Sequence, residues 1–225
     1  MSQTPISFGL IGAGIMGERM LRAALDQPAT ALGVSGIWDP SAEAMRRIAE
    51  ALPAVRQQAD AAALIAASDC VYIASPPSSH LVHARAALAA GKAVFCEKPL
   101  AVDLADARAF VAEAGERGAV NFPFASSPAV ARLRDWIASG VVGTPRRVSI
   151  EVAFATWPRS WQVDAAGWLD GPAQGGFTRE VVSHFLFLTR RIAGPFAGLS
   201  ATKTLNGCLT EPSLRPKRRS WRSSA

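Results

Sequence analysis

The chain has 225 residues, of which 49% are hydrophobic and 19% are charged, a composition that supplies a buried core and excludes wholesale disorder. No apolar run reaches the roughly 20 uncharged residues of a membrane span, and the N-terminus lacks the basic segment of a signal peptide. The three cysteines are widely spaced and form neither a disulfide framework nor a metal cluster. Such cysteines are typical of a reducing compartment, so we expect a cytoplasmic protein.

The net charge of +6 lies almost wholly at the C-terminus. Residues 215–225 hold five Lys or Arg and no acid, which leaves 19 basic and 18 acidic residues in 1–214. The rest of the chain is therefore nearly neutral. A short basic tail with one tryptophan does not favour nucleic-acid binding, and we expect neither a nucleic-acid nor a membrane partner.

Apolar runs alternate with helical patterns over the first half of the chain. Short apolar runs predict strands at 6–11, 32–38, 70–74, 93–96 and 119–122. Helical periods and capping residues predict helices at 19–25, 41–52, 78–90 and 103–117. This alternation indicates parallel strands joined by crossovers, and continuous apolarity fits a sheet covered on both faces. The predicted class is α/β, with a doubly wound sheet.

The pattern changes after Phe122. A helix is predicted at 127–139, an alternating strand at 146–155, an irregular stretch at 156–174, a helix at 181–192 and a possible strand at 196–205. We therefore divide the chain into a nucleotide-binding domain (1–122), a second α+β domain (123–205) and a basic, disordered tail (206–225).

The segment between the first strand and the first helix reads G-x-G-x-x-G. Its residues are Gly12, Ala13, Gly14, Ile15, Met16 and Gly17. In this setting the glycines permit a tight turn, the approach of a pyrophosphate and close helix–strand packing. Asp39 ends the second strand, 22 residues after Gly17, where a carboxylate can accept from both ribose hydroxyls of NAD and would repel a 2′-phosphate. The pattern predicts NAD binding, with NADP disfavoured. The alternatives are that these glycines only make a turn and that Asp39 is only a turn residue before Pro40.

Two further motifs follow strands. They are Ile73-Ala74-Ser75-Pro76-Pro77-Ser78-Ser79-His80 and Gly91-Lys92-Ala93-Val94-Phe95-Cys96-Glu97-Lys98-Pro99-Leu100. With the glycine loop, their order and spacing resemble the glucose-fructose oxidoreductase/inositol dehydrogenase family (Gfo/Idh/MocA) over residues 5–122, and more loosely to about 200.

The resemblance implies a Rossmann domain followed by a domain with an open antiparallel sheet. It also implies NAD(P)-dependent oxidation or reduction of a sugar, cyclitol or related small molecule, by proteins that form homo-oligomers. Lys98 would lie beside the nicotinamide and the substrate hydroxyl, where an ammonium can stabilise charge on the substrate oxygen. The Lys98–Pro99 bond is a candidate for the cis form.

The remaining residues of these motifs are candidates for the cofactor site. Ser75, Pro76 and Pro77 would form a wall beside the nicotinamide and its ribose, and Glu97 would fix the geometry at Lys98. His80 is either a ligand contact or a local cap. His83 is expected to be structural, because no acidic or cysteine partner makes a metal site with it.

Family members carry a Gly-Gly stretch, then an aspartate, then a histidine four residues later. Here Gly175-Gly176 is followed by Glu180 and His184, which share a helix face. His184 can take the proton of an alcohol, or can be a packed histidine. Glu180 can orient the imidazole or bind a substrate hydroxyl. With no third ligand apparent, we expect no metal.

Three tryptophans precede this motif together with Arg159. Trp157, Trp161 and Trp168 either stack on a sugar or pack an irregular loop, and Arg159 is a candidate for binding a carboxylate.

Family members are considerably longer than this chain. We therefore expect a C-terminally truncated member, produced by a frameshift or occurring as a natural short variant. The alternative function is nucleotide binding with little or no catalysis.

Overall fold

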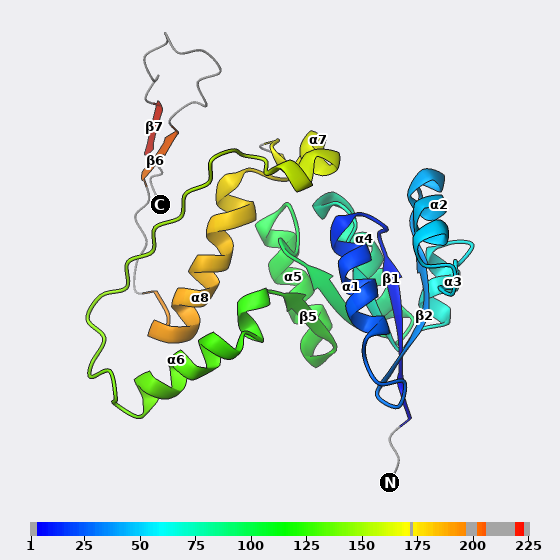
Figure 1. Ribbon diagram of the computed structural model, residues 1–225, viewed down its shortest axis with the longest axis horizontal. Coiled ribbons are helices and arrows are strands. Elements are labelled where there is room, and N and C mark those ends of the chain that lie inside the picture. The colour runs from blue at the N-terminus through cyan, green and yellow to red at the C-terminus, as the bar shows by residue number, and fades with distance from the viewer. Residues whose placement is uncertain (1–3, 172, 197–201, 206–218, 223–225) are drawn as a thin grey trace.

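Five parallel strands form the centre of the molecule. The computed structural model describes residues 4–171, 173–196, 202–205 and 219–222 (Figure 1). The sheet has the order β2-β1-β3-β4-β5. Its strands are β1 (Ile6–Ile11), β2 (Leu32–Trp38), β3 (Cys70–Ile73), β4 (Ala93–Glu97) and β5 (Gly118–Asn121). This Rossmann-like α/β sheet confirms the predicted class, and each of the five strands predicted in the first half of the chain is present with its ends shifted by at most one residue.

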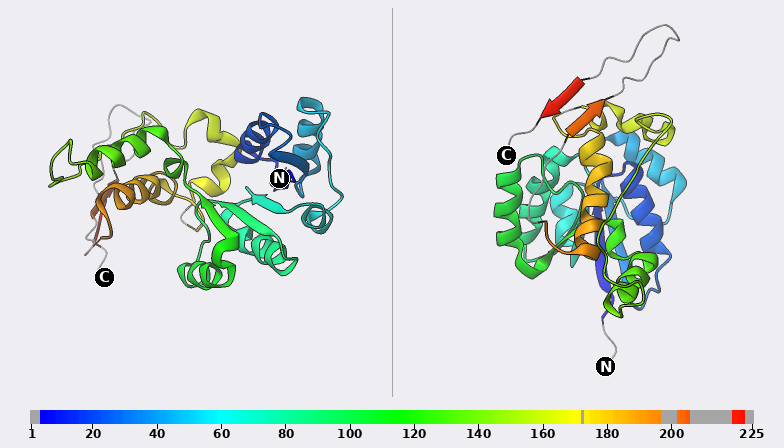
Figure 2. Two further views of the ribbon diagram at one scale, coloured as in Figure 1. Left: turned by 90° about the horizontal axis from the view of Figure 1, so that it is seen from below. Right: turned by 90° about the vertical axis from the view of Figure 1, so that its left-hand side faces the viewer.

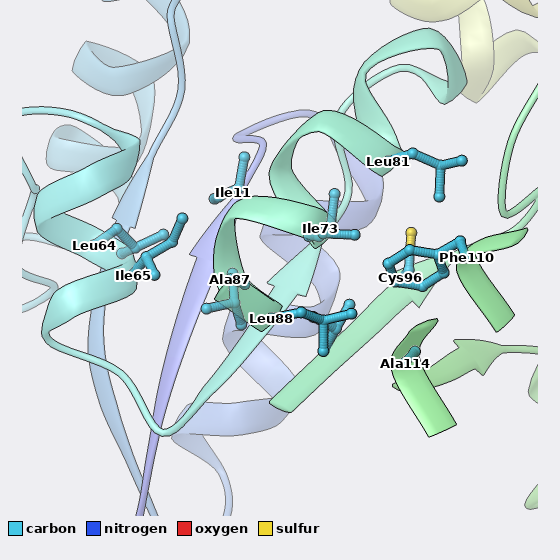
Figure 3. Close-up of a cluster of buried hydrophobic side chains, with 13 residues drawn as sticks. Ile11, Leu64, Ile65, Ile73, Leu81, Ala87, Leu88, Cys96, Phe110 and Ala114 are labelled. Atoms are coloured by element: carbon cyan, nitrogen blue, oxygen red, sulfur yellow. The ribbon is translucent and has the colours of Figure 1, made fainter. Parts of the chain in front are cut away.

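Helices cover both faces of the sheet. They are α1 (Ile15–Leu25), α2 (Ala42–Ala51), α3 (Ala61–Ala66), α4 (His80–Ala89) and α5 (Leu104–Ala114). Alternate strand residues enter opposite layers: Leu10 and Tyr72 pack with α1 and α2, whereas Ile11 and Ile73 pack with α3, α4 and α5 (Figure 3). Burial on both faces explains why these strands read as continuous apolar runs.

Helix ends follow the capping residues in the sequence. The side chains of Ser41 and Asp103 accept hydrogen bonds from the amides of Ala44 and Asp106, at 3.2 and 2.9 Å, as expected of N-caps. Helix α1 begins four residues earlier than predicted, because Gly14 is its N-cap. Helix α3 was not predicted. It is short, and Asp60 caps it by accepting from the amide of Ala63 at 2.7 Å.

The second part of the chain is mainly helical. Helices α6 (Pro128–Ala138) and α8 (Ser183–Ala193) lie side by side beyond β5 (Figure 2). A π-helical turn, Thr178–Val182, leads into α8, so helical structure begins three residues before the helix predicted at 181–192. Strands β6 (Thr202–Leu205) and β7 (Arg219–Arg222) pair in antiparallel fashion. Most of the predicted tail, 206–225, lies outside the described residues, and the domain boundaries remain predictions.

Two predictions for the second part are wrong. Residues 146–155 form no strand, although they alternate apolar and polar side chains. A strand needs a neighbouring strand to satisfy its amides, and none of the strands in the described part of the chain pairs with this segment. The stretch 156–174 is not wholly irregular, since it contains a 3₁₀ turn (Ser160–Ala165) and α7 (Ala166–Leu169).

No helix in the described residues has the length and apolarity to cross a membrane. The same residues contain no group of three or more His, Cys, Asp or Glu side chains that could hold a metal ion.

We expect Gly17→Ala to destabilise the fold, because a Cβ at this position would lie 1.8 Å from the carbonyl oxygen of Gly12. Separating α1 from β1 to relieve this overlap should cost about 1–3 kcal/mol of unfolding free energy, measured by urea denaturation. Gly33→Ala is the control, because its Cβ would meet no atom within 4 Å. Equal stability of the two variants would contradict this packing.

Candidate functional site

The loops that follow β1, β3 and β4 meet at the carboxyl edge of the sheet. They carry Gly12, Ser75 and Lys98 respectively. Ligands of open α/β sheets bind at this edge, so the fold brings the three sequence motifs to one place.

The glycine loop is closely packed on one side and open on the other. Gly12 has φ +105°, and a Cβ there would lie 2.6 Å from the carbonyl carbon of Ala74. Gly17 allows α1 to approach β1. A Cβ on Gly14, by contrast, would meet nothing within 4 Å, and Gly14 is the N-cap of α1. The open space at the helix N-terminus suits the phosphates of a dinucleotide, since the free amides of Ile15 and Met16 begin the helix there.

Asp39 is fixed by backbone amides at the end of β2. Its Oδ2 accepts from the amide of Ala13 at 2.7 Å and its Oδ1 accepts from that of Ser41 at 2.7 Å. Each carboxylate oxygen keeps a lone pair for a ribose hydroxyl. Arg47 donates to the carbonyl oxygen of Ala13 at 2.6 Å, and so helps to hold the glycine loop in place. The glycine loop and Asp39 together fit a dinucleotide.

Glu97 ties three neighbouring strands together just before Lys98. Its Oε1 accepts from the phenol of Tyr72 on β3, and from the side-chain amide of Asn121 on β5 at 2.7 Å. Its Oε2 accepts from the amide of Lys98 at 3.3 Å. Glu97 is buried, and burial together with its negative charge raises the pKa of the Tyr72 phenol. The carboxylate therefore fixes the backbone from which Lys98 extends, and the predicted cis Lys98–Pro99 bond is present.

His80 connects two of the motifs. Its Nε2 lies 2.6 Å from the carbonyl oxygen of Ser75 and its Nδ1 lies 2.9 Å from that of Pro99. The ring is 1% exposed, and burial lowers its pKa, with the carbonyl contacts acting in the opposite direction. Both ring nitrogens thus face backbone carbonyl oxygens. A neutral ring donates to one of the two at a time, and His80 lies between the two loops. His83 packs edge-on against Trp38.

The second part of the chain reaches Lys98 through Glu180. The ammonium of Lys98 lies 2.5 Å from Oε2 of Glu180 and 3.4 Å from the Glu180 carbonyl oxygen. The two side chains are 13% and 5% exposed, so this is a largely buried ion pair. The other carboxylate oxygen, Oε1, is buried and has no hydrogen-bond partner in the described residues.

His184 lies one helical turn after Glu180, edge-on to the rings of Phe122 and Phe124. Burial lowers its pKa to about 4, and the positive charges of Lys98 and Arg159 act in the same direction. The imidazole is therefore neutral at neutral pH. Glu180 does not hydrogen-bond it, so the structure shows no orientation of His184 by that carboxylate.

The tryptophans do not form one cluster. Trp157 packs with Phe154 and Phe177, whereas Trp161 contacts the guanidinium groups of Arg159 and Arg19. In the described residues, Trp168 makes no aromatic contact.

Sequence reasoning missed several residues that support the site. Tyr72 is the only tyrosine of the chain and stands in an otherwise aliphatic strand, which was a signal that its hydroxyl needs a partner. Gln174 accepts from the amide of Ser78 at 2.9 Å and so links the second part to the Ser75 loop. Nothing in the local sequence marks Arg47 or Gln174.

Comparison with known proteins agrees with this geometry. The family model GFO_IDH_MocA, described as an oxidoreductase family with an NAD-binding Rossmann fold, matches residues 6–124. Its description confirms the predicted cofactor, NAD. No curated protein matches the chain.

Solved structures share the fold. The WlbA dehydrogenase from Bordetella pertussis, in complex with NADH and UDP-GlcNAcA, is 23% identical with a TM-score of 0.75, and covers 94% of this chain and 63% of its own. The scyllo-inositol dehydrogenase from Lactobacillus casei is 21% identical with a TM-score of 0.57, over 64% of this chain and 44% of its own. The UDP-N-acetylglucosamine 3-dehydrogenase GnnA from Acidithiobacillus ferrooxidans is 29% identical with a TM-score of 0.52, over 59% and 43%. The present chain thus spans less than two thirds of each.

We expect Tyr72→Phe to lower the unfolding free energy by about 1–3 kcal/mol, because it removes a donor from a buried carboxylate while keeping the ring. Asn121→Ala removes the other side-chain donor and should act in the same direction. The double variant should cost more than the sum of the two, since Glu97 would keep only the amide of Lys98. Urea denaturation at neutral pH measures all three variants. Wild-type stability of Tyr72→Phe would show that the hydrogen bond to Glu97 does not support the site.

Proposed function

Because the chain belongs to the Gfo/Idh/MocA family of NAD-binding oxidoreductases, we propose that it transfers a hydride between NAD and a CH–OH carbon of a small molecule. The substrate class would be a sugar, a cyclitol or a related compound. The observation that carries the proposal is the position of Lys98 at the carboxyl end of β4, on the same sheet edge as the glycine loop that follows β1.

The first part of the chain would hold the cofactor. The amides at the start of α1 would bind the pyrophosphate beside Gly14, and Asp39 would accept from the adenosine ribose hydroxyls. Ser75, Pro76 and Pro77 would line the nicotinamide end. His80 and Glu97 would act through the backbone, by holding the Ser75 loop and the Lys98 loop in place.

Lys98 would stabilise charge on the reacting oxygen. When bound, NAD supplies the acceptor for the hydride. The Lys98 ammonium carries three protons for hydrogen bonds, and Glu180 takes one, so it can donate another to the substrate oxygen as negative charge develops there.

His184 would take the hydroxyl proton. Its imidazole is neutral at neutral pH and therefore has a lone pair ready to accept. The buried Oε1 of Glu180 would accept from a second hydroxyl of the substrate. This would supply the partner that the oxygen lacks and would favour polyhydroxylated substrates.

Neighbouring structures name substrates of this kind. One holds UDP-GlcNAcA with NADH, and another is a scyllo-inositol dehydrogenase. They support a sugar or a cyclitol as the substrate class and do not distinguish between the two.

Nucleotide binding without turnover is the second candidate. It is favoured by the pairing of Lys98 with Glu180, which offsets the positive charge that the reacting oxygen would need. The low pKa of His184 favours it as well, because an imidazole that binds protons weakly is a weak base.

Two measurements on the purified full chain separate the candidates. NADH should bind, as measured by its fluorescence, and a panel of polyols and sugars should reduce NAD, as measured by absorbance. Gly14→Val should fold, because its side chain meets open space, but should lose NADH binding. NADH binding with no reduction of NAD by any compound would favour the second candidate. Wild-type NADH affinity in Gly14→Val would contradict the loop assignment.

The pH dependence of oxidation should report on His184. The imidazole must be neutral to accept a proton, and its pKa is lowered to about 4. We therefore expect kcat/KM to persist well below pH 6.5 and to fall only as the pH falls through about 4. His184→Gln should remove this limb and lower kcat, whereas His83→Gln should keep the wild-type profile. A midpoint near 6.5, or a limb that survives in His184→Gln, would exclude His184 as the base.

A further inference from the structure

Trp161 contacts two arginines that come from different parts of the chain. The guanidinium carbon of Arg19, on α1, lies 4.4 Å from the ring centroid, and that of Arg159 lies 4.5 Å from it. Both guanidinium groups thus contact one ring, and Trp161 is 40% exposed. Two like charges that contact the same ring repel each other, and an anion bound to both would offset that repulsion.

Arg159 is held in a defined position with part of its guanidinium free. Its Nε donates to the side-chain oxygen of Gln162 at 3.0 Å, and Gln162 is 5% exposed. Its guanidinium also lies 5.0 Å from the ring centroid of Phe154. In the described part of the chain, neither terminal nitrogen of Arg159 makes a hydrogen bond. A guanidinium fixed at Nε and free at its fork is suited to bind a carboxylate or phosphate in bidentate fashion.

Among the described side chains, the carboxylates at the site pair with other cations. Lys98 is paired with Glu180, and Glu18 pairs with Arg22 rather than with its neighbour Arg19. No carboxylate of the described side chains lies within salt-bridge distance of Arg19 or Arg159. The positive charge of Arg159 is nevertheless felt by His184, which places it within electrostatic range of the site.

We propose that Arg159 and Arg19, arranged around Trp161, form an anion-binding subsite for a negatively charged substituent of the substrate. The inference rests on the proposed function and narrows it: the substrate is a sugar or cyclitol that bears a carboxylate or a phosphate. The exposed part of Trp161 contacts the ring of that substrate, while the arginines bind its anionic group.

The pyrophosphate of NAD is the competing source of negative charge, because Arg19 lies only five residues after Gly14. The position of Arg159 favours the substrate as the source of the negative charge. It belongs to the same part of the chain as Glu180 and His184, and its packing on Phe154 connects it through Phe177 to the turn that carries Glu180.

The test compares sugars that differ in charge. D-Glucuronate, D-glucose 6-phosphate and D-glucose are titrated into the full chain by calorimetry, with and without saturating NADH. We expect at least one of the two anions to bind about tenfold more tightly than glucose, the size of effect that a charged hydrogen bond provides. Comparing the two anions distinguishes a carboxylate from a phosphate.

Variants assign the effect to the two arginines. Arg159→Gln and Arg19→Gln should each reduce the preference for the anion and leave NADH affinity unchanged. Arg159→Lys should retain part of the preference, since it keeps the charge and loses the fork. Arg108→Gln, at an exposed position on α5, is the control for loss of one positive charge.

Three results would overturn the subsite. The first is equal binding of all three sugars, and the second is an anion preference that survives in both glutamine variants. The third is that the variants weaken NADH binding instead of anion binding, which would assign the arginines to the pyrophosphate. The titrations without NADH keep the two proposals separate. If NADH fails to bind while the anion preference persists, the proposed function fails and the subsite stands.

Discussion

The ion pair between Lys98 and Glu180 joins the two parts of the chain at the edge where the cofactor would lie. Lys98 is fixed from its backbone by Glu97, which ties it to β3 and β5, and from its ammonium by Glu180. Both members of the pair are largely buried. Removing either partner would leave an uncompensated buried charge, so the arrangement of the second part over the sheet depends on this contact.

This constraint also defines the site's chemistry. Glu180 places the start of α8 beside Lys98, which carries His184 to the same edge one turn later. The segment that precedes this turn packs Phe154 and Trp157 against Phe177. The position of Arg159 and Trp161 therefore follows from the same arrangement, and one ion pair supports both the proposed proton transfer and the proposed anion subsite.

Local sequence predicted the first part of the fold well. Strands buried on both faces have a strong apolar signal, and Ser41 and Asp103 mark their helices by capping. Helix α3 escaped prediction because a run of alanines and aliphatic residues over six positions shows no helical period. The strand expected at 146–155 failed for another reason: alternation reports a half-exposed strand only where a neighbouring strand is present to pair with it.

The site could be predicted only where it is local. The glycine loop and the Glu97-Lys98-Pro99 motif are each a continuous stretch of sequence, and the chemistry of each follows from its position after a strand. The hydrogen bonds of Glu97 depend on the register that sets Tyr72 and Asn121 beside it, and no local pattern gives that register. The contact of Lys98 with Glu180 joins residues 82 positions apart, and the contact of Arg19 with Trp161 likewise depends on how the two parts fold together.

A crystal structure of the full chain with NADH would show whether the nicotinamide binds beside Lys98. We expect the pyrophosphate against Gly14, the adenosine ribose on Asp39, and the nicotinamide between the Ser75 loop and the ammonium of Lys98, with the Lys98–Glu180 pair retained. A nicotinamide bound away from Lys98, or a Lys98 side chain turned out of the site with Glu180 left unpaired, would contradict it.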